Sequence, residues 1–356
     1  MTSFKKYFLY HFKSTFLRFI IIAVLSALLV STLVWSSTYS KRLEQTTSDV
    51  HLVVLTIVAI IISTLIPILE LLPFKSRRNM DTILFLPIDR KKMAAVHFIN
   101  GFLHIFLVNF ICFTITHVIL TRHSYPYESW NLILLFAFVL FGSLAIYSFT
   151  AFIFDRANTT ADGIIWLVIY SVIGSLTYSV ATNLYISLMG DSYFPNVNVW
   201  LVPGTFSPYY LLVSVWSTIN RVLIPKYTIL ETTNSILEIY SQPTLQTSDF
   251  VGMIFWAILI TLCILGFIRL FKIKRPENIG SVSTSAFGYK ILLPLTAITL
   301  LTGYEATLED AGLHVIILVA LIIGYIVYRK SIRFKPIDYV SIALAMILPT
   351  LLNFLR

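Results

Sequence analysis

The chain has 356 residues, of which 57% are hydrophobic and only 12% are charged. A soluble domain carries about 25% charged residues, so this composition excludes a sizeable soluble domain and indicates a protein surrounded mostly by lipid. The formal net charge of +9 could suggest a nucleic-acid partner, but the basic residues are placed as orienting charges at a membrane. Both cysteines, Cys112 and Cys263, fall inside apolar stretches and define no disulfide framework.

Residues 1–18 predict an amphipathic helix of their own. Lys6 and Lys13 lie seven residues apart, on a different face from a stripe of phenylalanines. The stripe repeats every four residues and consists of Phe4, Phe8, Phe12 and Phe16. This pattern is typical of a helix that lies in the membrane interface. We expect an elbow helix flat on the inner leaflet; the alternative is a generic basic, aromatic anchor.

Apolar runs long enough to cross a membrane fill most of the remaining chain. A helix of about 18 or more apolar residues can span the hydrocarbon core. Six clear candidates are 19–36, 51–72, 94–120, 131–154, 163–186 and 250–271, and three weaker ones are 289–304, 312–328 and 338–355. We therefore expect an all-α polytopic membrane protein, with a six-span core over 19–271 and extra C-terminal spans within 272–356.

The basic residues indicate how these spans are oriented. With the N-terminus inside and all nine spans crossing, 20 of the 26 lysines and arginines lie in inner segments and 6 in outer ones. Cytoplasmic loops carry the excess of basic residues in membrane proteins. The N-terminus is therefore predicted to be cytoplasmic, with the loop 74–92 inside and the segment 187–249 outside.

The loop between the second and third spans predicts a short surface helix. Its apolar edge has helical spacing and consists of Met80, Ile83 and Leu84. Arg77 and Asp81 can pair at i, i+4 on another edge. Pro87 ends the helix, and Asp89 offers a side-chain cap to the next one. A rigid, partly apolar helix at this position is suited to docking a soluble partner; the alternative is a helix resting on lipid headgroups.

The segment 187–249 is the only long outer segment. The run Trp200–Gly204 breaks the chain, and Ser207-Pro208 favours a new helix start. The following stretch, Tyr209–Leu223, is apolar enough to dip into the bilayer. Broken backbone at membrane depth is tolerated only where protein or a watery cavity covers it. An outer amphipathic lid and a re-entrant hairpin both fit this pattern.

The sequence contains no recognisable catalytic motif. It has no G-x-x-x-x-G-K-[ST] loop, no H-E-x-x-H and no G-x-S-x-G. His97 and His104 lie seven apart on one helical face and could share a metal or a proton, but hydrogen bonding within the bundle is the favoured interpretation. Glu70 lies one turn from the inner surface, where a local ion pair is expected. Asp155-Arg156 and Asp162 bracket a short inner loop that is predicted to be a solvated turn; the alternative is a second contact for a partner.

Several of these features together resemble the permeases of ABC-2 type transporters. The stretch Arg78–Arg90 resembles that family's charged coupling helix and the Leu-Pro-Ile-Ser/Asp-Arg step after it. The basic first helix and the outer segment before the sixth span are similar to the family as well, so the resemblance covers roughly 1–271. Lys274–Gly280 resembles a step in longer Gram-positive members with extra C-terminal spans, among them exporters of antimicrobial or cytolytic peptides such as the phenol-soluble modulin exporter.

The resemblance implies a non-catalytic subunit of a bacterial exporter in the plasma membrane. Two permease subunits, identical or different, would sit above two soluble ATPase subunits, which bind the ATP. This chain would hold no cofactor, no metal and no catalytic residue, and would contact lipid but no nucleic acid. Its coupling residues would be Arg77, Arg78, Asp81, Leu84, Phe85, Pro87 and Arg90.

The absence of a mid-span carboxylate favours a hydrophobic or amphipathic substrate, such as a peptide, toxin, antibiotic or lipid-like molecule. Spans two and five and the stretch Tyr209–Leu223 are predicted to line its path. The aromatic residues proposed for this path are Tyr170, Tyr178, Tyr209, Tyr210 and Trp216. Aromatic rings with a polar group suit half-wet surfaces, although they also form interfacial belts. The alternatives to a permease are an integral-membrane enzyme and a membrane protein for peptide sensing or immunity.

Overall fold

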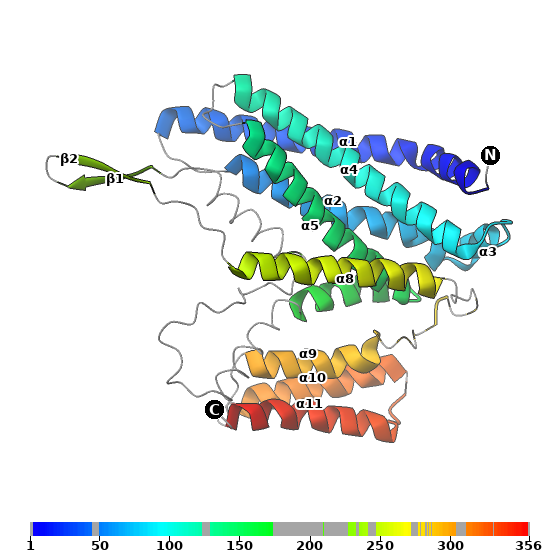
Figure 1. Cartoon of the computed structure of the whole chain (residues 1–356). Helices are drawn as coiled ribbons and strands as arrows, with labels where there is room; N and C mark the ends of the chain where they lie inside the picture. Colours follow the sequence, from blue (N-terminus) through cyan, green and yellow to red (C-terminus); the bar gives the residue numbers. More distant parts are fainter. Residues whose placement is uncertain are drawn as a thin grey trace. The chain divides into compact units, whose positions relative to one another are not determined.

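A computed structural model gives the architecture of the chain (Figure 1). It describes residues 3–44, 50–122, 129–173, 209, 227–232, 235–240, 247–271, 277, 279–281, 283, 285, 287–303, 311–329 and 331–354. The chain forms two compact units, each assembled from separate stretches of sequence. The first unit comprises Met1–Glu70, Ile88–Ser148 and Leu211–Leu262, and the second comprises Leu71–Pro87, Phe149–Tyr210 and Cys263–Arg356.

Long helices dominate the first unit. They are α1 (Ser3–Glu44), α2 (Val50–Leu71), α4 (Arg90–Arg122) and most of α5 (Ser129–Arg156) and α8 (Thr247–Phe271). α1 and α4 run side by side over much of their length (Figure 1). α1 continues without a break past residue 18, so a separate elbow helix is not confirmed. The phenylalanine stripe and the first predicted span belong to one helix.

A two-stranded hairpin is the exception to the helical architecture. β1 (Tyr227–Thr232) pairs antiparallel with β2 (Ser235–Tyr240), with Tyr227 opposite Tyr240 and Thr232 opposite Ser235. These stretches are rich in β-branched and aromatic residues, which favour extended backbone. The prediction of an all-α chain is confirmed for the apolar spans, and this short hairpin lies outside them. The rest of the predicted lid or re-entrant stretch, apart from Tyr209, lies outside the described residues.

The second unit contains short helices and a three-helix core. The short ones are η1 (Leu72–Lys75), α3 (Arg77–Leu84) and a helix over Thr160–Ile173. The core is formed by α9 (Tyr289–Gly303), α10 (Ala311–Arg329) and α11 (Pro336–Phe354), which pack against one another. Its buried centre consists of Ala297, Leu301, Ile317, Leu321 and Ala345. The last three predicted spans are thus helices that share one core.

Within the described ranges, five helices are long and apolar enough to cross a membrane. They are Phe4–Ser36, Val53–Lys75, Arg90–Arg122, Leu132–Arg156 and Gly252–Phe271. They correspond to five of the six clear spans predicted from the sequence. The other four predicted spans appear as shorter apolar helices, at Thr160–Ile173, Tyr289–Thr302, Gly312–Tyr328 and Pro336–Leu351. The second half of the predicted span 163–186 lies outside the described residues.

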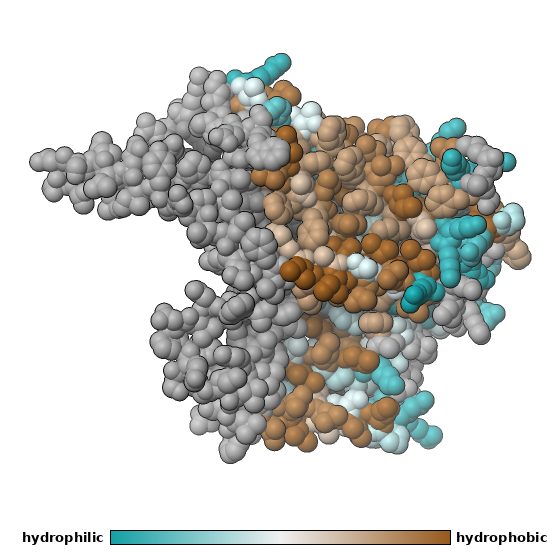
Figure 2. Space-filling view, in the orientation of Figure 1, coloured by the Kyte–Doolittle hydropathy of each residue, from teal (hydrophilic) through white to brown (hydrophobic). Residues whose placement is uncertain are grey.

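Many large apolar side chains point outward from these helices. On α1, Leu17 is 70% exposed and Leu25 is 62% exposed. Figure 2 shows hydrophobic residues, in brown, over the visible sides of the helices. Such surfaces are costly in water and favourable in lipid. The backbone of a helix is also satisfied internally, which lipid requires.

Candidate functional site

The short helix predicted between the second and third spans is present as α3. Its Met80 is fully buried, whereas Arg78 and Asp81 are exposed. The helix ends at Leu84, two residues before the Leu86-Pro87 step, as expected for a residue preceding proline. Phe85 follows directly and is 86% exposed. One face of α3 is therefore anchored, and its C-terminal end presents an aromatic side chain to the surroundings.

The remaining predicted coupling residues lie at the start of the next helix. Pro87 is exposed, and Arg90 is the first residue of α4. Asp89 caps α4 as predicted, because its Oδ1 accepts a hydrogen bond from the Lys91 backbone N–H at 3.2 Å. This cap fixes where α4 begins after the α3 segment.

The guanidinium of Arg77 binds a different partner from the one predicted. Among the residues that the structure describes, Arg77 and Asp81 form no ion pair. Instead Arg77 Nε donates to the Ile279 carbonyl at 3.3 Å, and Nη2 donates to the Glu277 carbonyl at 3.2 Å. The planar fork of arginine suits two neighbouring acceptors of this kind. The contact ties α3 to a segment 200 residues further along the chain.

The prediction of a solvated turn after the fourth span is wrong at its first residue, Asp155, whereas Asp162 at its other end is half-buried. Asp155 is 2% exposed and forms an ion pair with Arg156. Lys75 is buried beside it and donates hydrogen bonds to the carbonyls of Phe154 and Ala157. Lysine near a helix C-terminus satisfies carbonyls that have no partner within the helix. Sequence spacing could not predict these contacts, because Lys75 lies 80 residues before Asp155 in the chain.

The segment after α8 completes this end of the second unit. Gly280 has φ of 81°, a conformation that favours glycine, and its N–H donates to the Asn158 carbonyl at 3.4 Å. Ser283 Oγ donates to the Arg156 carbonyl at 3.0 Å. We call the region formed by 72–85, 154–158 and 277–283 the anchored end. Its three segments are far apart in sequence and are joined by hydrogen bonds.

The predicted substrate-path residues are only partly described. Tyr170 OH donates to the Phe287 carbonyl at 2.9 Å, and its ring packs edge-on against Phe149. Its hydroxyl is thus committed to the second unit's own structure. Tyr209 is half-buried. The other three, Tyr178, Tyr210 and Trp216, lie outside the described residues, so the proposed path stays a prediction.

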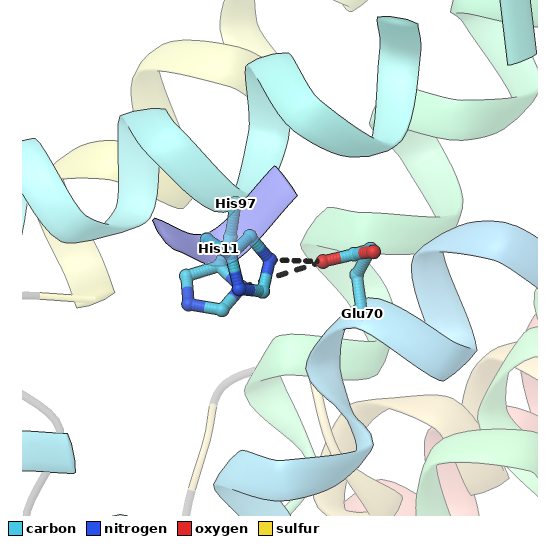
Figure 3. A group of neighbouring side chains, drawn as sticks. All are labelled: His11, Glu70 and His97. Carbon is cyan, nitrogen blue, oxygen red and sulfur yellow. Dashed lines mark hydrogen bonds and ion pairs between the residues drawn. The ribbon is translucent and has the colours of Figure 1, made fainter. Parts of the chain in front are cut away.

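A buried polar cluster lies between α1, α2 and α4 in the first unit, around the carboxylate of Glu70. The Glu70 side chain is 1% exposed. His11 Nε2 on α1 lies 2.7 Å from Glu70 Oε2 (Figure 3). Arg18, also on α1, forms an ion pair with Glu70 Oε1 and donates to the Leu69 carbonyl at 3.0 Å. A buried carboxylate is costly unless it is paired and hydrogen-bonded, and α1 supplies both partners.

Two histidines of α4 complete this cluster. His97 Nδ1 lies 3.5 Å from Glu70 Oε2, and His104 Nδ1 lies 3.9 Å from Oε1. The hydroxyl of Tyr7 is 3.0 Å from His97 Nε2. Glu70 therefore faces three imidazoles and one guanidinium, and the Tyr7 hydroxyl is hydrogen-bonded to one of these imidazoles. We call Tyr7, His11, Arg18, Glu70, His97 and His104 the Glu70 cluster.

The sequence predicted part of this cluster correctly. A local ion pair of Glu70 was expected and is confirmed, although its partner is Arg18 of α1 and not a residue of the basic loop. His97 and His104 share one helical face and take part in contacts within the bundle, as favoured. His11 was missed. The signal was a polar stripe at helical spacing, Tyr7, His11, Thr15 and Arg18, which the neighbouring phenylalanine stripe concealed.

An apolar groove lies elsewhere on the first unit. It has a volume of about 610 Å³ and is lined by Ser31, Thr32, Trp35, Thr114, Ile115, Val118 and Ile119 of α1 and α4. Even the nearest of these residues lies about three helical turns further along its helix than the Glu70 cluster. The groove therefore does not open onto that cluster.

Comparison of the chain with protein-family models, curated proteins and solved structures gives no match. The class of protein therefore rests on the fold itself. The five apolar helices of spanning length define a multi-pass membrane protein of the helical type.

Proposed function

We propose that this chain is the non-catalytic permease subunit of an ATP-driven exporter, which moves a hydrophobic or amphipathic substrate and depends on a separate soluble ATPase. The observation that carries the proposal is α3. It is a short helix between two spanning helices, with one face buried through Met80 and an exposed aromatic residue, Phe85, at its end. The sequence resemblance to ABC-2 type permeases points to the same helix.

The contacts of α3 support a role in transmitting motion. Arg77 is hydrogen-bonded to the carbonyls of Glu277 and Ile279. Gly280 is in turn hydrogen-bonded to Asn158, at the end of α5. A force applied to α3 would therefore act on the whole anchored end and on the helices that enter it. A helix that merely rested on headgroups would not need these bonds.

The exposed side of α3 has the composition of a docking surface. Phe85 is flanked by the exposed Leu86, with charged Arg78 and Asp81 on the preceding turns. Protein interfaces commonly combine an apolar or aromatic anchor with a polar rim. The partner we propose is the soluble ATPase, with a groove that receives Phe85. Closure of the ATPase on ATP would then pull on the anchored end.

The surfaces of the spanning helices support the substrate class. Many of their outward side chains are large and apolar, and the groove between α1 and α4 is lined by four apolar residues, among them Trp35 and Val118, and by three residues with hydroxyl groups. In the described spans, Glu70 lies at the end of α2 that leads into the basic loop, and it pairs with Arg18 of α1. Such walls suit a molecule that partitions from the bilayer.

An integral-membrane enzyme remains the second candidate, because the Glu70 cluster contains the acid and base groups that catalysis uses. Two observations favour the permease over it. The Glu70 and His97 side chains are 1% and 3% exposed, which leaves a substrate no access in this conformation. The groove between α1 and α4 is lined by other side chains.

Site-specific crosslinking tests the permease proposal. A photoreactive amino acid at Phe85 should crosslink, in native membranes, to a soluble subunit that binds ATP. The matched control is Ile332, which is 82% exposed in the second unit but lies outside α3. Phe85→Asp should leave insertion intact and abolish the ATP-dependent export of an amphipathic peptide, whereas Ile332→Asp should not. A chain that purifies alone and shows no crosslink from Phe85 would contradict the proposal.

A further inference from the structure

We propose that His11, Glu70 and His97 form a binding site for a divalent first-row transition-metal ion, for which Zn²⁺ is the natural probe. Each residue offers one ligand atom, and these three atoms lie within 4.8 Å of one another (Figure 3). They come from α1, α2 and α4, so a bound ion would crosslink three helices. This property is independent of the proposed transport function.

The distances suit a metal without rearrangement of the backbone. Zinc binds histidine nitrogen and carboxylate oxygen at about 2.0–2.2 Å, which places neighbouring ligands of a tetrahedral site roughly 3.4 Å apart. His97 Nδ1 is 3.5 Å from Glu70 Oε2. His11 Nε2 is 2.7 Å from the same oxygen. An ion therefore requires His11 to withdraw by less than about 1 Å, which side-chain rotation can supply.

The surroundings of His97 match those of a metal ligand. Its Nε2 lies 3.0 Å from the hydroxyl of Tyr7. When Nε2 carries the ring proton, its N–H donates a hydrogen bond to the tyrosine oxygen. The unprotonated Nδ1 then directs its lone pair towards Glu70. Metal-binding histidines usually have their second nitrogen held in this way, which fixes the tautomer and the orientation of the ring. Tyr7 is thus assigned as a positioning residue.

The charged groups around Glu70 allow its carboxylate to exchange the Arg18 guanidinium for a metal ion. Arg18 pairs with Oε1 of Glu70, the oxygen that the two proposed histidine ligands do not face. Its side chain is 31% exposed, whereas that of Glu70 is 1% exposed. When a divalent ion arrives, the guanidinium can turn to water or headgroups, because arginine extends readily to a polar interface. Arg18 and the metal therefore compete for the same carboxylate.

The donor set selects the class of metal. Two imidazoles and one carboxylate favour zinc and its neighbours over calcium or magnesium, which prefer oxygen ligands. The fourth position is available to water or to His104. His104 Nδ1 lies 3.9 Å from Glu70 Oε1, and its buried Nε2 has no hydrogen-bond partner among the described residues.

Equilibrium dialysis of the full chain in detergent, carrying a tag that contains no histidine, tests the site. Wild-type protein should bind one Zn²⁺ per chain and should unfold at a higher temperature when zinc is present. His11→Ala and Glu70→Gln should each weaken binding by at least about tenfold, and Tyr7→Phe by about 10-fold to 100-fold. His117→Ala, on α4 but outside the cluster, should leave the affinity unchanged.

Arg18→Gln separates a metal site from a structural ion pair. It keeps all three ligands and removes the competing cation, so zinc should bind more tightly than to wild type. A purely structural cluster would gain no affinity from this change. The proposal is overturned if wild-type protein binds no zinc, or if Arg18→Gln weakens binding while folding normally. Export assays without added zinc report separately on the permease proposal.

Discussion

His11 Nε2 on α1 lies 2.7 Å from Glu70 Oε2 on α2, although 59 residues separate the two in the chain. The contact brings the N-terminal helix against the end of the second helix, where Arg18 pairs with the other carboxylate oxygen. Glu70 is therefore the point at which α1, α2 and α4 meet.

The Arg18–Glu70 pair should show an asymmetric response to mutation. Arg18→Gln removes the guanidinium partner of a carboxylate whose side chain is 1% exposed, and should cost about 3 kcal/mol of unfolding free energy. Glu70→Gln leaves a guanidinium whose side chain is 31% exposed, and should cost less. Unfolding in mixed detergents measures both. Equal losses would show that Arg18 is held as tightly as Glu70.

Gly101 should not tolerate a side chain. A Cβ at this position would overlap the Tyr147 hydroxyl and lie 3.2 Å from Glu70 Cγ. Gly101→Ala should therefore destabilise the protein by about 1–3 kcal/mol, because a packed interior cannot absorb the added volume. Unfolding midpoints in detergent measure the change.

Two further variants control for this effect. Adding Tyr147→Phe to Gly101→Ala removes the overlapping hydroxyl, so the double variant should be more stable than Gly101→Ala alone. Gly312→Ala on α10, where a Cβ would meet nothing within 4 Å, should be neutral or slightly stabilising. A Gly101→Ala protein as stable as wild type would contradict the close packing of α4 and α5.

Lys75 should be important for the anchored end. Its ammonium group donates to the carbonyls of Phe154 and Ala157, so Lys75→Met should cost about 1.5–3 kcal/mol. Thermal unfolding measures the loss. The control is Lys91→Met, an exposed lysine, which should change stability by less than about 0.5 kcal/mol. Similar values for the two variants would show that the Lys75 contacts contribute little.

The membrane orientation can be tested by labelling. In a chain with Cys112 and Cys263 replaced by alanine, single cysteines are introduced at Ser192 and Ser281. An impermeant reagent should modify position 192 in intact cells and position 281 only in inverted vesicles, because the basic loops are expected inside. Modification of both positions in intact cells would contradict the predicted orientation.

The sequence by itself determined the helical membrane class of this protein and the position of α3. Long apolar runs can only be helices in lipid, since no water satisfies their backbone there. Met80 and Pro87 marked the buried edge and the end of α3, and Asp89 marked the start of α4, because spacing, proline and capping act within a few residues. Local rules of this kind need no knowledge of the fold.

Only the tertiary structure decided the partners of Arg77 and Glu70. Arg77 was expected to pair with Asp81 four residues away, but it binds carbonyls at Glu277 and Ile279. Glu70 likewise receives its partners His11 and Arg18 from another helix. A charge removed from water takes whichever complementary group the packing of helices brings nearest. That group can lie 52 or 200 residues away, and a helical stripe in the sequence can mark a polar face but does not identify the partner of that face.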